Sequence, residues 1–421
     1  MPFEKRFVTL DADKCKGCIT CMKRCPTEAI RVRGGKAKIL YERCIACGEC
    51  IRACSYHAKK AVYDKMEIID GYKYKVALPP PALYGQFNNL NDINYVLEGL
   101  LSIGFDDIYE TSRGAELISE ATRNFIADGK ANRKPIIGTT CPAIVDLILL
   151  KFHDLKDNML TLLTPVDVAA KLAREKAVAD TGLRPEEIGV FFISSCPAKV
   201  YSLKSAFGVK APLVDGVLSV NEIYFKLINE MPKIQNPREL SKAGVTGLSW
   251  AVSGGEAAGI FGNVSFAVDG LENVINILKD IEDDKVHHTD YIELNACSGG
   301  CVGGVLNIEN PYIAKAKIGV LKKYAPVSKN NIEQTGKSRE FFCQEKDFEV
   351  SQAFKLDDDR VKAMTKLKQI GGIYRQLAHL DCGICGAPSC KAFSEDVVLR
   401  GQSIEACVKF RLPELGGGKE R

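Results

Sequence analysis

The chain has 421 residues, of which 46 % are apolar and 26 % charged, and its formal net charge is +4. This length allows two or three domains with cores of their own, and the small charge gives no sign of binding to nucleic acid or a membrane surface. No stretch reaches the roughly 18 uninterrupted apolar residues of a membrane span. The first residues carry charges where a signal peptide would be apolar, so we expect a cytoplasmic protein.

Cysteine is the most informative residue of this sequence, with 17 copies. Two explanations compete, a disulfide framework and metal ligation. Disulfide-dense proteins are typically small and secreted, and this chain fits neither description. All the cysteines except Cys343 fall in clustered motifs. This clustering favours metal ligation.

Residues 1–74 are rich in cysteine and contain an internal repeat. The runs CKGCITCMKRCP and CIACGECIRACS share the spacing C-x2-C-x2-C-x3-C, about 29 residues apart, which indicates a duplicated half-domain. This is the spacing of bacterial two-cluster ferredoxins, in which the fourth cysteine of each run ligates the other cluster. One [4Fe–4S] cluster is therefore expected on Cys15, Cys18, Cys21 and Cys54, and a second on Cys44, Cys47, Cys50 and Cys25. A zinc site is the alternative, but eight cysteines in duplicated register argue against it.

Residues 75–324 alternate between strand-like and helix-like segments. The runs KVALPPPALYG, PIIGTTC, IGVFFISSC and HHTDYIELNAC are typical of strands, whereas NYVLEGLLSIGF and VDVAAKLAREKAVADTG have helical periodicity. Strands separated by helices predict parallel α/β layers. Cysteines lie just past the ends of three of these strands, where sites collect in sheets of this kind.

The segment 325–355 is polar and is expected to form a linker or a surface arm. Residues 356–421 open with DDDRVKAMTKLKQIGGIYRQLAHL, a predicted helix whose acidic start suits the helix dipole. The spacing C-x2-C-x4-C-x16-C follows, with a helix predicted between the last two cysteines. These residues, Cys382, Cys385, Cys390 and Cys407, are expected to hold a further [4Fe–4S] cluster, with zinc as the alternative.

Three more motifs lie in the α/β region: TTCPAIV, SSCPAKVYSLK and ELNACSGGCVGG. They contain Cys141, Cys196, Cys297 and Cys301. A lone cysteine of this kind would usually be structural, but four thiolates together make one more [4Fe–4S] site. In order and surroundings the motifs resemble the catalytic domain of [FeFe]-hydrogenases over about residues 75–320. That family has the signature segments TSCCPxW, MPCxxK and ExMxCxxGCxxGG, and weaker similarities lie in TSRGAEL, DGVLSVNEI and SGGEAA.

This resemblance implies an α/β hydrogenase-like domain, with an N-terminal ferredoxin-like α+β domain and a small, mostly helical C-terminal iron–sulfur domain. It also implies an H-cluster, in which a cubane is joined through one cysteine to a diiron unit with CO, cyanide and a dithiolate amine. By position, Cys141, Cys196, Cys297 and Cys301 would hold the cubane, and Cys301 would be the bridge. Lys199 matches the lysine that hydrogen-bonds a cyanide, as suits a cation facing an anionic ligand; a surface lysine is the alternative. The chain would then carry four [4Fe–4S] clusters and the diiron subcluster.

Several positions depart from the family pattern. Thr140 replaces the cysteine that relays protons to the dithiolate amine, and a hydroxyl exchanges protons less readily than a thiol with a pKa near 8.5. Asn295 and Ser194 replace two methionines of the signature segments. Glu116 and Glu120 lie near the acidic residues of the usual proton path in the sequence but do not align with them. The sequence thus keeps all the cluster ligands but lacks the fast proton path. This combination, like the C-terminal cluster motif, resembles the sensory branches of the family.

The function that this resemblance implies is reversible 2H⁺ + 2e⁻ ⇌ H₂ at low turnover, in the service of a hydrogen or redox sensor. Its partners would be a redox or downstream signalling protein and the maturation proteins that supply the diiron unit, and a homodimer stays open. The alternative is an iron–sulfur carrier or assembly protein that lacks the diiron unit, and a third interpretation is an electron-transfer subunit of a larger complex.

Five residues are given no role in the site. Cys343 is expected to be a free or buried thiol, His287 and His288 to be solvated, and Trp250 to belong to the core. His379 precedes the last cysteine cluster and could tune it or pair with Asp381.

Overall fold

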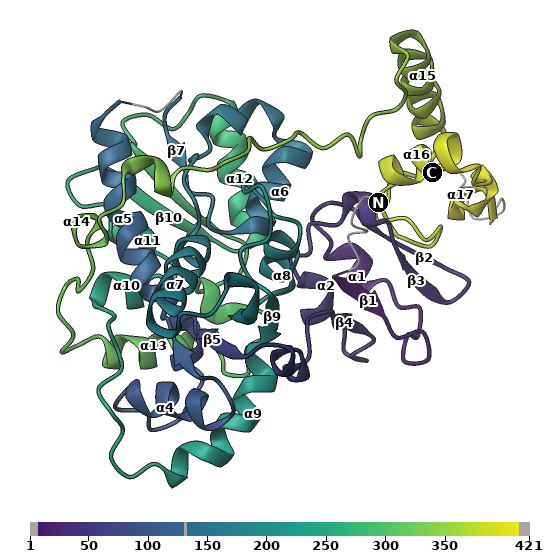
Figure 1. The fold of residues 1–421 in the computed structure, drawn as a ribbon. Helices are drawn as coiled ribbons and strands as arrows, with labels where there is room; N and C mark the ends of the chain where they lie inside the picture. Colours follow the sequence, from purple (N-terminus) through teal and green to yellow (C-terminus); the bar gives the residue numbers. More distant parts are fainter. Residues whose placement is uncertain (1–6, 130–132, 412–421) are drawn as a thin grey trace. The chain divides into compact units, whose positions relative to one another are not determined.

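The computed structural model describes residues 7–129 and 133–411, which fall into two compact units (Figure 1). The first unit contains the described residues up to Cys44, the segment Gly48–Lys60 and those from Val350 onward. The second contains Ile45–Cys47 and Ala61–Glu349. This division differs from the four consecutive segments expected, because the C-terminal cysteine segment packs with the N-terminal one.

The N-terminal part of the first unit shows the duplication as matching pieces of structure. Each cysteine run ends in a single turn of helix, α1 (Thr20–Lys23) or α2 (Glu49–Arg52). Strands β2 (Ile30–Arg33) and β3 (Lys36–Ile39) form an antiparallel pair, and β1 (Val8–Leu10) pairs with β4 (Lys59–Ala61). Cysteines and small apolar residues share one core here.

The C-terminal part of the first unit is helical, with α15 (Arg360–Gln376), α16 (Cys390–Arg400) and α17 (Val408–Arg411). The predicted acidic start is found, since Asp359 caps α15 by accepting hydrogen bonds from two backbone N–H groups. The Val32 N–H donates to the Gly386 carbonyl at 2.9 Å. Because an added Cβ on Gly386 would stand 2.0 Å from the Val32 oxygen, glycine permits this close approach.

The second unit is built on parallel sheets covered by helices (Figure 1). One sheet has the order β6-β5-β8-β9, with the bounds β5 Tyr74–Leu78, β6 Asp107–Ile108, β8 Ile188–Ser194 and β9 Gly216–Ser219. All seven residues of β8 are buried, as expected for an apolar run in a parallel sheet.

A second parallel sheet has the order β10-β11-β7. Its strands are β10 Ser265–Asp269, β11 Tyr291–Asn295 and the short β7 Ile136–Ile137. The strands predicted from PIIGTTC, IGVFFISSC and HHTDYIELNAC are therefore present. The parallel-sheet α/β core that the sequence predicts is found.

The helices of the second unit connect and cover these strands. Their bounds are α3 Pro81–Tyr84, α4 Asn94–Ser102, α5 Thr111–Ala127, α6 Pro142–Lys151, α7 Pro165–Thr181, α8 Pro197–Lys204, α9 Val220–Glu230, α10 Val245–Ser249, α11 Gly255–Ala258, α12 Leu271–Glu282, α13 Pro311–Leu321 and α14 Ile332–Thr335. Helix α7 begins at a capping box, because Thr164 Oγ1 accepts from the Asp167 N–H and the Asp167 carboxylate accepts from the Thr164 N–H. No helix among the described residues is long and apolar enough to cross a membrane.

The polar stretch after residue 325 packs onto the second unit as far as Glu349, which differs from the linker or arm expected. The buried Glu116 carboxylate accepts hydrogen bonds from the N–H groups of Lys329 and Asn330, both at 2.8 Å. Phe342 is 1 % exposed and belongs to a core shared with α5. The polar side chains of this stretch thus face a buried acid that needs donors.

Candidate functional site

Three of the four cysteines of the α/β region lie where a parallel strand ends. Cys141 follows β7 and is the N-cap of α6, Cys196 follows β8 and is the N-cap of α8, and Cys297 follows β11. Proline takes the first position of both α6 and α8, where it needs no hydrogen-bond partner. The strand-end prediction is confirmed.

The fourth cysteine, Cys301, lies in a glycine-rich loop that packs tightly on its surroundings. Gly300 has a φ of +89°, and a Cβ there would stand 2.4 Å from the Ser253 nitrogen. A Cβ on Gly304 would stand 2.2 Å from the Ser195 carbonyl oxygen, which lies next to Cys196. The glycines therefore let this loop approach the loop after β8 closely.

The four thiols lie within electrostatic reach of one another. Burial raises the pKa of Cys141 to about 11, and Cys297 and Cys301 act on it as neighbouring charges. Burial likewise raises the pKa of Cys196 to about 12, with Cys297 and Cys141 among its neighbours. Buried thiols need a cation that keeps them ionised, and a set of four cysteine sulfurs is the donor set of a [4Fe–4S] cluster.

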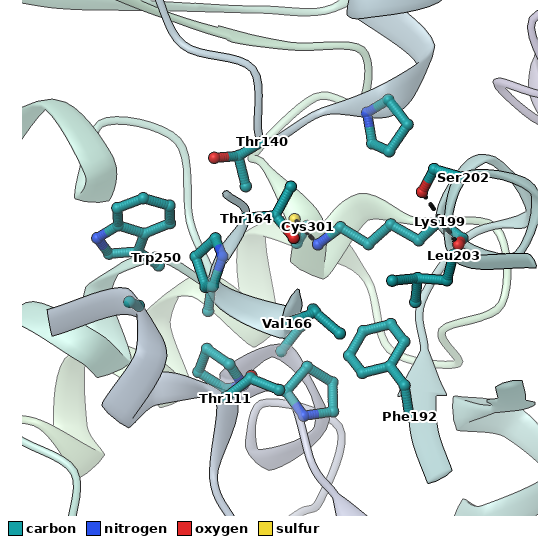
Figure 2. Close-up of a pocket in the computed structure, with 17 residues that line it drawn as sticks. Thr111, Thr140, Thr164, Val166, Phe192, Lys199, Ser202, Leu203, Trp250 and Cys301 are labelled. Atoms are coloured by element: carbon teal, nitrogen blue, oxygen red, sulfur yellow. Dashed lines mark hydrogen bonds between the residues drawn. The ribbon is translucent and has the colours of Figure 1, made fainter. Parts of the chain in front are cut away.

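Lys199 points from α8 to Cys301 across the floor of a pocket (Figure 2). Its ammonium donates to the Cys301 sulfur at 3.3 Å. Burial opposes the charge of Lys199, but Cys301 and Cys196 outweigh it and raise the lysine pKa. Lys199 is thus a half-buried residue and not a freely solvated surface lysine, and its ammonium stands beside the thiol.

The pocket next to Cys301 encloses about 580 Å³ of space not filled by atoms, its open mouth included. Its walls are mostly apolar, with Val166, Phe192 and Leu203 among them, and Thr140 and Thr164 supply hydroxyl groups (Figure 2). Trp250, expected in the core, also lines this pocket, and its indole N–H donates to Ser119 Oγ at 3.0 Å. An apolar pocket with one cation and a few polar groups suits a small anionic group bound through Cys301.

A pair of buried acids lies behind Thr140. The Thr140 hydroxyl donates to Glu256 Oε1 at 3.3 Å, and the Tyr291 hydroxyl donates to the same oxygen. Burial and the neighbouring Glu293 raise the pKa of Glu256 to about 8. A carboxyl group with this pKa holds a proton at neutral pH and can exchange it.

Glu293 is fixed by neutral donors instead of a cation. The N–H groups of Gly254 and Ala257 donate to its two oxygens at 3.0 and 2.9 Å, and Asn295 Nδ2 donates to Oε1 at 2.6 Å. Burial raises the pKa of Glu293. Asn295 is thus turned toward an acid of its own strand.

Ser194 supports the loop that carries Cys196. Its hydroxyl donates to the Cys196 carbonyl at 2.9 Å and accepts from the Cys196 N–H at 3.3 Å. Ser194 is fully buried. The contacts of this residue therefore position a thiol.

In the first unit, Cys21 and Cys50 each have several other cysteines as charged neighbours. Burial raises the pKa of Cys21, whose neighbours include Cys18, Cys54 and Cys15. Burial also raises the pKa of Cys50, whose neighbours are Cys44 and Cys25 and also Cys21. Cys47 belongs to the stretch Ile45–Cys47, outside this unit.

The C-terminal cysteines form a third group. Burial raises the pKa of Cys385, and its charged neighbours are Cys382, Cys407 and Cys390. The Cys390 N–H donates to Asp381 Oδ1 at 2.5 Å. His379 instead stacks edge-on against Tyr374, with ring centroids 4.4 Å apart.

Of the remaining residues, Cys343 is a free thiol whose Sγ donates to the Arg339 carbonyl at 3.6 Å. The sequence reasoning missed Glu256 and Glu293 as members of the site. Both lie inside segments already noted, SGGEAA and ELNACSGGCVGG. An acidic residue inside an otherwise small and apolar motif was the available signal, because buried acids are rare without a purpose.

Residues 73–264 and 262–305 match the family described as "Iron only hydrogenase large subunit, C-terminal domain". The chain belongs to this family. Residues 7–55 match a 4Fe-4S dicluster domain, and residues 377–409 match a "Putative Fe-S cluster" domain. The ferredoxin and hydrogenase assignments made from the motifs are thus confirmed at the level of the domain.

Among characterised proteins, the chain is 24 % identical over 256 residues to "NADP-reducing hydrogenase subunit HndD" of Solidesulfovibrio fructosivorans, covering 52 % of this chain and 44 % of that one. It therefore spans less than half the length of that relative. The chain is also 40 % identical over 50 residues to a ferredoxin of Methanothermococcus thermolithotrophicus, covering 11 % of this chain and 83 % of that one.

Solved structures of [FeFe]-hydrogenases share this fold. A variant of HydA1 from Chlamydomonas reinhardtii aligns with a TM-score of 0.53 at 13 % identity, covering 69 % of this chain and 97 % of that one. An [FeFe]-hydrogenase studied for inactivation by oxygen aligns with the same TM-score at 14 % identity, covering 66 % of this chain and 95 % of that one. At this identity the likeness concerns the fold alone.

Proposed function

We propose that this chain is an [FeFe]-hydrogenase of low turnover that reports hydrogen or redox state to a partner protein. In this proposal Cys141, Cys196, Cys297 and Cys301 hold a cubane, and Cys301 bridges it to a diiron unit in the adjacent pocket. The observation that supports it most is the 3.3 Å contact from Lys199 Nζ to Cys301 Sγ. A carrier of a plain cubane would have no use for an apolar pocket on one side of one ligand.

When bound, the diiron unit would supply an open iron position and a basic amine at which H₂ is split or formed. Lys199 would hold its ammonium toward the anionic face of that unit. The apolar walls around Val166 and Phe192 would keep water from the reacting atoms. Ser194 would hold the Cys196 loop in place.

The proposed low turnover rests on the proton route. Thr140 has a hydroxyl where high-turnover relatives have a thiol, and a hydroxyl does not ionise near neutral pH. The Thr140 hydroxyl donates to Glu256 Oε1 at 3.3 Å. Glu256 would therefore be the next group after Thr140 to hold the transferred proton. Tyr291 donates to Glu256, and Glu293 is the nearest further acid. Proton transfer along this route would pass through the Thr140 hydroxyl and would therefore be slow. A slow rate suits a sensor better than an enzyme of high turnover.

Electrons would travel through the ferredoxin-type clusters and the C-terminal cluster to a redox or signalling partner. The diiron unit would be inserted by separate maturation proteins. The test is infrared spectroscopy of matured full-length protein, with and without H₂. Bands of metal-bound CO and cyanide that shift under H₂ would support the proposal. Their absence from protein that carries all its cubanes and was offered the diiron precursor would overturn it and leave an iron–sulfur carrier.

A further inference from the structure

The two halves of the ferredoxin-type repeat differ at one buried position. Five residues after the last cysteine of each run stand Ile30 and Lys59. Their registers match, because the residues two places earlier, Glu28 and His57, share positive φ values of 51° and 50°. Both positions are buried, with Ile30 2 % and Lys59 3 % exposed. One half therefore has an apolar side chain where the other has an ammonium group.

The Lys59 ammonium has no hydrogen-bond partner among the residues that the structure describes. Burying an unpaired cation is costly, so an anion must face it in the functional protein. The adjacent Lys60 shows the ordinary alternative, since its exposed side chain pairs with Asp11 at 2.9 Å. The Lys59 side chain is thus buried without a partner, whereas the next residue, Lys60, is exposed and paired with a carboxylate.

The anion that fits this position is an iron–sulfur cluster. Lys59 lies in the unit whose core contains Cys15, Cys21 and Cys54. Burial raises the pKa of the Cys21 thiol, and the Lys59 charge is the largest influence in the opposite direction. The influence of Lys59 on Cys50, in the other group, ranks behind those of Cys44 and Cys25. The Lys59 charge thus acts on two ligands of the first group, Cys21 and Cys54, and on one ligand of the second, Cys50.

We propose that Lys59 is a positioning residue that raises the reduction potential of the cluster held by Cys15, Cys18, Cys21 and Cys54 above that of its twin. Reduction adds one electron, and hence one negative charge, to a cluster that is already anionic. A fixed cation at close range favours that added charge, and net charge and surroundings set cluster potentials. Ile30 offers the second cluster no such charge, so the duplicated domain has two unequal sites.

This difference in reduction potential determines which of the two ferredoxin-type clusters holds an arriving electron. The favoured cluster carries Cys21 on α1, and the C-terminal cysteine segment touches the same turn. A Cβ on Gly383 would stand 3.0 Å from the Met22 Cε and 3.3 Å from the Ile19 Cδ1. The electron would therefore be held on the ferredoxin-type cluster next to the C-terminal one.

The test is a redox titration of the full-length, cluster-loaded chain, followed by electron paramagnetic resonance of the reduced clusters. Lys59→Met removes the charge with little change of shape, and Lys59→Arg keeps it. Lys60→Met is the matched control on the exposed side. We expect K59M to lower one ferredoxin-type midpoint so that the ratio of reduced to oxidised cluster falls at least tenfold at a fixed potential, equivalent to about 59 mV for one electron. K59R and K60M should leave it near the wild-type value.

Two results would overturn this inference: unchanged midpoints in K59M, or an equal shift of both midpoints. If K59M fails to retain its clusters, Lys59→Gln takes its place in the same titration, with the same two outcomes. The readout does not depend on the diiron unit, so failure of the hydrogenase proposal would leave this test intact.

Discussion

Arg31 and Asp396, 365 residues apart in sequence, form a fully buried bidentate ion pair. Arg31 Nε stands 2.6 Å from Asp396 Oδ2, and Nη2 stands 3.1 Å from Oδ1. Their side chains are 2 % and 0 % exposed, and Arg33 and Arg400 also pair with Asp396. This carboxylate joins the C-terminal cysteine segment to the ferredoxin-like part of the first unit.

Replacing Asp396 should therefore separate the two parts. We expect Asp396→Asn to cost about 3–5 kcal/mol, because it leaves buried arginine charges uncompensated. Proteolysis should then cut near residue 355 faster than in wild type, and the C-terminal cluster should be lost first. Glu405→Gln, an exposed change in the same segment, is the control. Equal cleavage of D396N and wild type would show that the ion pair does not hold the segment.

Lys199→Met should impair uptake of the diiron unit and leave the cubanes in place. A charge-assisted hydrogen bond is worth about 1.5–3 kcal/mol, so retention of the unit should fall about 10- to 100-fold. Infrared band intensity per chain, set against total iron, separates the two effects. The exposed Lys210→Met is the control. Full infrared bands in K199M would contradict the role assigned to Lys199.

Thr140→Cys should raise hydrogen turnover. A thiol with a pKa near 8.5 exchanges protons far more readily than a hydroxyl, and a positioned acid or base is worth about a hundredfold or more. We expect at least a tenfold gain per infrared-active site, and no gain in Thr140→Val. Hydrogen–deuterium exchange under D₂ measures it. A T140C variant no faster than wild type would place the slow step elsewhere.

Gly304→Ala should disrupt the hydrogenase cubane alone. The new Cβ would stand 2.2 Å from the Ser195 carbonyl oxygen, and since that atom is backbone, the loops carrying Cys196 and Cys301 must separate. In chains loaded with cubanes but not with the diiron unit, iron content should fall by about four atoms per chain, while the ferredoxin-type signals remain. Gly319→Ala in α13 meets nothing within 4 Å and should keep all its iron.

Glu256 should make stability depend on pH. Its pKa is raised from 4.5 to about 8, by burial and then by Glu293. Between these values the unfolded chain has lost this proton while the folded chain keeps it, so the free energy of unfolding falls as pH rises from about 4.5 to 8. Glu256→Gln should remove a fall on the order of 5 kcal/mol, measured as denaturant midpoints of the cluster-loaded protein.

Thr140, Tyr291, Glu293 and Lys199 all act on this carboxyl group, and E256Q leaves each of them in place. Glu272→Gln, an exposed change on α12, is the control. The same pH dependence in E256Q as in wild type would show that another group carries it.

Spacing made the cysteine groups predictable. Ligands must approach a cluster within fixed distances, so the runs around Cys15 and Cys44 and the strand ends before Cys141 and Cys196 could be predicted directly. Lys199 could be placed for a similar reason, because three residues along a helix lie on nearly the same face as the ligand.

Long-range pairing of charges could not be predicted. Asp396 in the middle of α16 looks like a solvated residue until Arg31 is known to face it. The polar stretch around Asn330 looks like an arm until Glu116 is found beneath it. The raised pKa of Glu256 depends on Glu293, which lies in a different element, β11. In each case the tertiary fold determines the partner, so the local sequence cannot predict it.

The hydrogen bond from Val32 to Gly386 has a consequence for how the chain is made. The ribosome releases the ferredoxin-like residues before those from Val350 onward, with Ala61–Glu349 of the second unit between them. The first unit therefore cannot be completed until the residues from Val350 have been made, and contacts this distant in sequence form slowly. During that interval the open cysteine runs are accessible to whatever loads their iron, so late closure of the C-terminal segment would seal clusters already in place.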